Sequence, residues 1–199
     1  MSNVMLITGG SRGIGAATAR MAAAEGYDVC VNYANDADAA AAVVADCRSL
    51  GVSAMAVQAD VRDGSGVVAL FEETEAELGE LTVLVNNAAI LRQGSRLEDF
   101  TAERVREVLD ENVVGAFLCA REAVRRMSTA HGGEGGSIVN VSSAASYLGS
   151  PNEFIDYAAT KGAMDTMTIG LAKEVAAEGI RVNAVRPGLI DTEIHASSG

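Results

Sequence analysis

Positive charge is scarce in this sequence: 15 lysines and arginines face 27 aspartates and glutamates, which gives a formal net charge of −12 over 199 residues. Nucleic acid and anionic membrane surfaces both require basic patches, so this balance argues against either as a partner. Cysteine is also scarce, and the three thiols, Cys30, Cys47 and Cys119, have no close spacing. An odd number of separated cysteines indicates a reducing compartment and no disulfide framework.

The sequence also has few histidines and lacks long hydrophobic runs. Two histidines, His131 and His195, are too few for a histidine-based metal cluster, so no metal is expected. The opening MSNVMLITGG has no basic region, and its apolar run is too short for a signal peptide. No stretch of the sequence reaches transmembrane length. These absences predict a cytoplasmic protein that does not cross a membrane.

Short apolar runs rich in β-branched residues alternate with longer helical patterns. Strands are expected at 4–8, 28–33, 53–59, 81–87, 137–143 and 180–186. Helices are expected at 13–25, 36–49, 63–78, 101–127 and 152–178. Strict alternation indicates βαβ units, and therefore an α/β fold with a parallel sheet covered by helices on both faces. The length suits one domain with a substantial core.

The segment GGSRG, residues 9–13, fits two kinds of chemistry. As G-x-S-x-G it would be a nucleophile elbow, with Ser11 as nucleophile and Asp191 and His195 completing a triad. As part of TGGSRGIG it would be a glycine-rich turn that brings a backbone and a helix N-terminus to a dinucleotide pyrophosphate. In that case Gly9 permits the turn, Gly13 the approach to phosphate, and Gly15 the close packing of helix and strand.

Tyr157 and Lys161 stand four residues apart in a helical pattern, so they share one helix face. The chain has two lysines against thirteen arginines, which makes this pairing more specific. For a phenol of pKa about 10 to act as acid and base near neutral pH, its pKa must fall by up to about 3, and a close ammonium can supply about 1–3 of that. Alternatively, the ring packs on the lysine stem. Upstream, Ser142 and Ser143 either begin a loop or orient a substrate carbonyl.

Five segments then occur in order: TGGSRGIG at 8–15, NNAA at 86–89, NVSS at 140–143, YAATK at 157–161 and RPGLIDT at 186–192. Together they resemble the short-chain dehydrogenases/reductases, from residue 3 to about 194. The resemblance favours the dinucleotide turn over the nucleophile elbow. It implies a doubly wound Rossmann fold of strand order 3-2-1-4-5-6-7 and an NAD(P)-dependent oxidoreductase acting on a small carbonyl or alcohol substrate.

The resemblance also assigns roles to residues. Tyr157 matches the catalytic acid/base, Lys161 the lysine that lowers its pKa and binds the nicotinamide ribose, and Ser143 the serine that holds the substrate oxygen. The spacing from Ser143 to Tyr157 is one residue longer than in many relatives, so Ser142 competes for that role. Asn112 matches an asparagine linked to a proton-relay water. Cofactor contacts are expected from Gly9, Ser11, Arg12, Gly13, Ile14, Gly15, Asn32, Asp60, Val61, Asn86, Ala88, Tyr157, Lys161, Pro187, Gly188, Ile190 and Thr192.

The choice of cofactor depends on the end of the second strand, where an NAD-selecting site places a carboxylate on the ribose 2′-hydroxyl. Asn32 occupies the position where that acid is expected, and Arg12 lies in the glycine turn. A neutral amide beside a guanidinium attracts a 2′-phosphate that a carboxylate would repel. We therefore expect NADP(H) to be preferred, with NAD(H) as the alternative.

The sequence stops at HASSG, residues 195–199, where relatives continue through a substrate lid, a helix and a seventh strand. We therefore expect one NAD(P)-binding domain over residues 1–199 without the seventh strand, a poorly closed substrate site and a tendency to aggregate. Helices 101–127 and 152–178 match helices that pack between subunits in relatives, so a homo-oligomer, a dimer or tetramer, is expected. The alternative function is an NADP-binding protein without turnover, and a Ser11 hydrolase ranks third.

Overall fold

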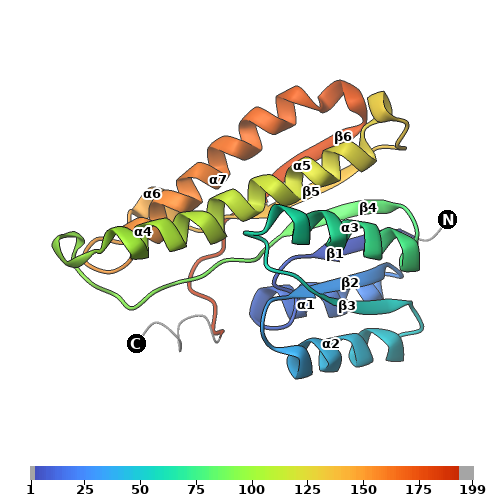
Figure 1. Ribbon diagram of the computed structural model, residues 1–199, viewed down its shortest axis with the longest axis horizontal. Coiled ribbons are helices and arrows are strands. Elements are labelled where there is room, and N and C mark those ends of the chain that lie inside the picture. The colour runs from blue at the N-terminus through green and yellow to red at the C-terminus, as the bar shows by residue number, and fades with distance from the viewer. Residues whose placement is uncertain (1–2, 193–199) are drawn as a thin grey trace.

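The alternating pattern folds into a parallel sheet in the computed structural model, which describes residues 3–192 (Figure 1). The strands are β1 (Val4–Ile7), β2 (Asp28–Tyr33), β3 (Ala54–Gln58), β4 (Leu81–Asn86), β5 (Gly136–Val141) and β6 (Ile180–Val185). Within the described chain these six strands pair in the order β3-β2-β1-β4-β5-β6, and every neighbouring pair is parallel. The Rossmann arrangement predicted from the sequence is confirmed.

Helices cover both faces of the sheet. They are α1 (Gly13–Ala24), α2 (Ala37–Ser49), α3 (Gly64–Leu78), α4 (Ala102–Leu109), α5 (Gly115–Met127), α6 (Ala145–Leu148) and α7 (Ile155–Glu174), with short helical turns η1 (Leu97–Asp99), η2 (Asp110–Val114), η3 (Thr129–His131) and η4 (Ala176–Glu178). Helices α1 and α2 pack on one face, and α3, α5 and α7 pack on the other. No helix within residues 3–192 combines the length and the apolar character needed to cross a membrane.

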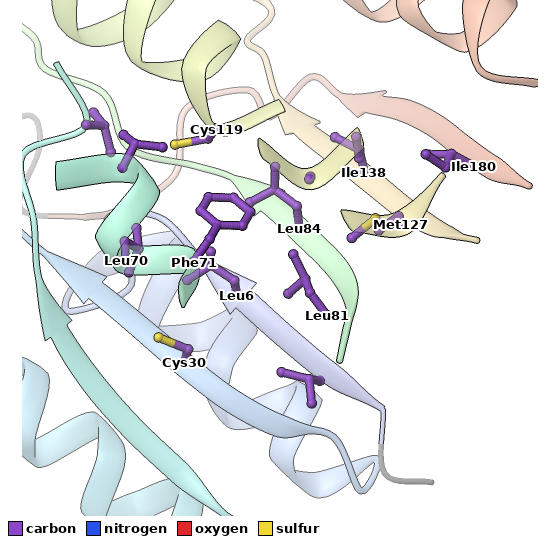
Figure 2. Packing of buried hydrophobic residues seen from close by; sticks show 14 of the residues in the cluster. Leu6, Cys30, Leu70, Phe71, Leu81, Leu84, Cys119, Met127, Ile138 and Ile180 are labelled. Carbon is purple, nitrogen blue, oxygen red and sulfur yellow. The ribbon is translucent and has the colours of Figure 1, made fainter. Parts of the chain in front are cut away.

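Strands β1 to β5 each contribute to two separate cores because successive side chains point to opposite faces of the sheet, whereas β6 contributes to one core only. On β1, Leu6 belongs to the core under α3 and α5, whereas Ile7 belongs to the core under α1 and α2. Figure 2 shows the first of these cores, where the fully buried ring of Phe71 lies among Leu6, Leu84 and Cys119. Strands buried on both faces explain the nearly continuous apolar runs in the sequence.

Two of the long helices expected from the sequence differ in the structure. The predicted helix 101–127 is divided by η2, a π-helical turn, into α4 and α5. The predicted helix 152–178 begins at Ile155, because Ser150 and Asn152 have φ of +42° and +64° and cannot belong to a right-handed helix. Strand β5 ends at Val141, two residues before the predicted end, which leaves Ser142 and Ser143 beyond the strand.

Candidate active site

The residues singled out in the sequence gather at the edge where the parallel strands end. Gly9 follows β1, Asp60 follows β3, Ala88 follows β4, Ser143 follows β5 and Pro187 follows β6. In doubly wound sheets this carboxyl edge is where ligands bind. The fold therefore brings segments from across the whole chain to one candidate site.

The turn between β1 and α1 has the backbone that its glycines were expected to provide. Gly9 and Gly13 adopt φ of +60° and +52°, a region that strains other residues. A Cβ on Gly15 would lie 2.4 Å from the carbonyl oxygen of Gly9 and 2.6 Å from Asn87 Nδ2. Helix α1 thus approaches the turn more closely than any side chain at residue 15 would allow.

The N-terminus of α1 differs from those of three other helices. Asp36, Asp63 and Thr101 cap α2, α3 and α4, each accepting a hydrogen bond from a first-turn N–H group. The N-cap of α1, Arg12, is extended and makes no capping side-chain hydrogen bond within the described chain. The first N–H groups of α1 and the helix dipole are therefore available to an anion, and these residues fit a dinucleotide pyrophosphate.

An open groove of about 1050 Å³ runs beside this turn. It is lined by residues 11–14, by facing residues of α1 and α2, and by residues 190–192. The structure thus brings Ile190 and Thr192 to the glycine turn. At the start of the same segment, the Pro187 carbonyl accepts a hydrogen bond of 2.9 Å from the N–H of Ala144, and Gly188 follows.

Hydrogen bonds from the end of β4 fix the glycine turn from the other side. Thr8 Oγ1 accepts from the N–H groups of Asn87 and Ala88, both at 3.0 Å. Asn87 Nδ2 donates to the carbonyls of Thr8 and Gly9, both at 2.9 Å. The resemblance placed Asn87 in the segment against the adenine ribose side, whereas the sequence analysis gave Thr8 no role of its own.

Two asparagines expected at the cofactor use their amides within the fold. Asn32 is buried, accepts from the N–H of Gly9 at 3.3 Å and donates to the carbonyl of Ala59 at 3.0 Å. Any effect of Asn32 on a cofactor would therefore act through the turn at Gly9. Asn86 is also buried and donates to Asn140 Oδ1 at 3.0 Å, which joins the ends of β4 and β5.

Asp60 and Val61 follow β3, as the sequence analysis placed them. Val61 is buried against Gly115, where an added Cβ would lie 2.6 Å from its Cγ2. Hydrogen bonds from Arg62 Nε and Nη2 lower the pKa of Asp60. Arg62 Nε also lies 3.4 Å from Glu111 Oε2, and burial followed by the charge of Asp60 raises the pKa of Glu111. Arg62 thus links two carboxylates at this end of the site.

The two serines after β5 have different surroundings. Ser142 is buried and donates to the carbonyl of Lys161 at 3.1 Å. Ser143 Oγ accepts from the N–H of Ala145 at 3.1 Å and lies close enough to the Tyr157 phenol to lower its pKa. The geometry therefore brings Ser143 to the phenol and uses Ser142 to hold α7.

Burial shifts the pKa values of Tyr157 and Lys161 in opposite directions. It raises the pKa of Tyr157, and the Ser143 hydroxyl offsets this only in part. It lowers the pKa of Lys161 to about 8, against the opposing effect of Asp165. Lys161 Nζ lies 5.4 Å from the centre of the Tyr157 ring and donates to the carbonyl of Val141 at 2.7 Å. The net shift of the phenol is opposite to the fall expected from the sequence, because loss of solvent disfavours phenolate.

Asp165 is a site residue that the sequence analysis missed. It follows Tyr157 and Lys161 on α7 at the same four-residue spacing. Its Oδ2 accepts a hydrogen bond of 2.9 Å from Arg186 Nε, directly before Pro187. Extending the four-residue spacing from Lys161 by one further helical turn would have predicted that Asp165 shares this helix face.

Asn112 lies in the π-helical turn η2 and is buried. Its Oδ1 accepts from the N–H of Ile90 at 2.7 Å, and its Nδ2 donates to the carbonyl of Ile90 at 3.0 Å and to Thr160 Oγ1 at 3.3 Å. Thr160 lies between Tyr157 and Lys161 on α7. Asn112 thus ties the segment after β4 to the helix that carries the tyrosine and lysine, and π-turns are frequent at functional sites.

The hydrolase alternative required a histidine near Ser11. His131 lies in η3, before β5 begins, whereas Ser11 follows β1 at the opposite edge of the sheet. Asp191 borders the same groove as Ser11. His195 lies outside the described residues, so within residues 3–192 no histidine lies on the same edge of the sheet as Ser11.

Comparison with known proteins identifies the class of this protein as an oxidoreductase built on a Rossmann sheet. A family model for short chain dehydrogenases matches residues 3–199, and the chain belongs to this family.

Individual relatives cover most of the chain. The uncharacterized oxidoreductase YgfF of Escherichia coli (strain K12) is 56% identical over 196 residues, which span 98% of this chain and 79% of that protein. The 3-oxoacyl-[acyl-carrier-protein] reductase FabG of Staphylococcus aureus (strain N315) is 39% identical over 98% of this chain and 77% of its own. A short chain dehydrogenase from Burkholderia cenocepacia J2315, solved in complex with NADP, has a TM-score of 0.89 and 40% identity over 96% of this chain and 76% of that one.

Replacing Asp165 by asparagine should lower the pKa of Lys161 below its value of about 8, because the Asp165 carboxylate favours the ammonium. The chain has two lysines, so labelling with ¹³C-lysine gives two side-chain signals that can be titrated by NMR, with Lys173→Arg to assign them. Asp46→Asn, which removes a surface partner of Arg20, is the control. An unchanged or higher Lys161 pKa in folded Asp165→Asn would contradict the assignment.

Proposed function

We propose that this oxidoreductase transfers a hydride between NADP(H) and a carbonyl or alcohol substrate, with Tyr157 as general acid and base. The observation that carries the proposal is the convergence of Ser143, Tyr157 and Lys161 at the same sheet edge as the uncapped start of α1. A buried phenol with a raised pKa stays protonated at neutral pH, so Tyr157 holds a proton to donate.

The residues divide the chemistry between them. A bound nicotinamide would supply or accept the hydride at the substrate carbon. In the reducing direction, Tyr157 Oη gives its proton to the substrate oxygen, while the Ser143 hydroxyl donates a hydrogen bond that orients the same oxygen. The Lys161 ammonium stabilises the phenolate that remains. A proton from solvent then returns to Tyr157, relayed by a water beside Asn112. In the oxidising direction, the phenolate accepts the proton from the alcohol.

The preference for NADP(H) is proposed from Arg12. Its side chain is exposed at the start of α1 and lines the groove. Arg20 lines the same groove, but its guanidinium pairs with Asp46 at 2.8 Å. Arg12 is therefore the better placed cation for a 2′-phosphate. The Burkholderia relative, which contains NADP, supports this choice.

Tyr157→Phe should reduce turnover by about 10²–10⁴-fold, because it removes the acid and base while keeping the ring that packs. Its affinity for NADPH should stay nearly unchanged. NADPH oxidation with a panel of ketones and aldehydes measures turnover, and titration calorimetry on the same preparation measures affinity. Tyr147→Phe alters an exposed phenol and should have no effect. Most of the turnover surviving in Tyr157→Phe would refute the role, whereas NADPH binding with no turnover in the unmodified chain would favour the non-catalytic alternative.

Arg12→Ala should weaken NADPH binding by about 1.5–3 kcal/mol, the value of a charge-assisted hydrogen bond, and weaken NADH binding far less. Titration of both cofactors into both proteins tests this. Arg20→Ala is the matched control and should affect the two cofactors equally. A similar loss for NADPH and NADH in Arg12→Ala would show that Arg12 does not contact the 2′-phosphate.

We also propose that the chain forms a homo-oligomer through the helices on the α5 and α7 side. Four apolar residues there are at least 41% exposed: Leu109, Val114, Phe117 and Ile169. Phe117→Asp should shift the assembly toward monomer, because it places a charge where apolar surface would be buried. Sedimentation velocity measures the shift. Met21→Asp changes a more exposed apolar residue on α1 and should leave the assembly intact. An unaltered assembly in Phe117→Asp would exclude this surface.

A further inference from the structure

The segment that follows β4 is held in place although residues 87–96 form neither helix nor strand. Asn112 binds it at Ile90 through both the backbone N–H and the carbonyl. Further along, the N–H of Ser95 donates to the carbonyl of Glu153 at 3.1 Å. The segment therefore packs against the residues that directly precede α7, the helix that carries Tyr157.

Arg104, on α4, joins the same two stretches with every nitrogen of its guanidinium. Its Nη1 donates to the carbonyl of Gln93 at 2.7 Å and to Ser95 Oγ at 2.8 Å. Its Nε and Nη2 donate to the two carboxylate oxygens of Asp156 at 2.7 and 3.3 Å. The guanidinium also lies over the ring of Phe100, 3.9 Å from its centre.

Asp156 carries this contact to the tyrosine. It directly precedes Tyr157, and its Oδ1 accepts a hydrogen bond of 2.9 Å from the N–H of Tyr157. The N-cap of α7, Phe154, makes no capping side-chain hydrogen bond in the described part of the chain, so Asp156 orders this first turn. The side chains of Arg104 and Asp156 are 15% and 5% exposed, which protects the pair from solvent and salt. Figure 1 shows α4 beside the N-terminal end of α7.

We propose that Arg104 is a positioning residue: its guanidinium clamps residues 93–95 to Asp156 and thereby fixes both Tyr157 and the segment after β4. This inference rests on the proposed role of Tyr157. Removal of the clamp should lower kcat and raise KM for the carbonyl substrate, because small displacements of a reacting group are costly. NADPH binding should be unaffected, because the glycine turn lies elsewhere on the sheet edge.

The first test does not depend on turnover. The chain has four tyrosines, so labelling with fluorotyrosine gives four ¹⁹F signals, and Tyr157→Phe assigns the relevant one. In Arg104→Met the Tyr157 signal should shift or broaden, and amide exchange over 90–96 and 153–160 should accelerate by about tenfold or more. Arg106→Met is the matched control, because Arg106 lies on the same helix but is 72% exposed and pairs with the exposed Glu103. It should leave the signal and the exchange unchanged.

Turnover and rescue separate a positioning role from a purely structural one. Arg104→Met should reduce kcat by about 10–10²-fold at unchanged NADPH affinity. Arg104→Lys keeps the positive charge but loses the planar, forked guanidinium, so its kcat should lie between those of the unmodified protein and Arg104→Met. It also provides a second variant if Arg104→Met does not fold. A normal Tyr157 signal with normal exchange in a folded Arg104 variant would overturn the clamp, whereas full turnover in Tyr157→Phe would instead overturn the proposed function.

Discussion

The structure depends on one close contact, between the backbone of α1 at Gly15 and the turn at Gly9. Because a Cβ at residue 15 would lie 2.4 Å from the Gly9 carbonyl, the contact requires glycine. Asn87 and Asn32 supply the hydrogen bonds that hold this turn to β4 and β2. Each such bond left unmade would cost about 1–3 kcal/mol. Side chains of neighbouring strands thus fix the turn. Because the N-terminus of α1 has no capping side chain, the helix loses about 1 kcal/mol of stability, and a bound anion would offset this loss.

Around Tyr157 and Lys161, the burial that accompanies the packing of α7 also determines the protonation states of these two side chains. Loss of solvent keeps the Tyr157 phenol neutral and weakens the hold of Lys161 on its proton. Asp165 opposes the effect on Lys161 and binds Arg186 at the end of β6, so one carboxylate connects the ammonium to the segment after that strand. The chain alone therefore favours a protonated phenol. Positive charge brought in by an oxidised nicotinamide would act in the direction that makes the phenolate easier to form.

Periodicity predicted the strands, because strands buried on both faces leave continuous apolar runs, whereas the order of the strands came from the family resemblance. Periodicity did not predict which groups the polar side chains hydrogen-bond. Asn32 was matched by position to an acid, but its amide is used on Gly9 and Ala59 inside the sheet. A π-turn at 110–114 barely alters the helical period, so the sequence favoured one helix across it. Asp165 was within reach of a spacing argument, whereas Arg104 and Asp156 are 52 residues apart and no local pattern pairs them.

The use of arginine and lysine follows from the shape of their cations. Arg104 bonds three separate groups in directions set by a planar fork, which a single ammonium could not satisfy together. Lys161 occupies a buried position where Nζ donates to the carbonyl of Val141, and its pKa can fall to about 8. A guanidinium in that position would be larger, would leave donors unpaired and would not titrate. Of the two lysines, Lys173 is exposed, so the buried site next to the tyrosine is where the chain places a compact, titratable charge.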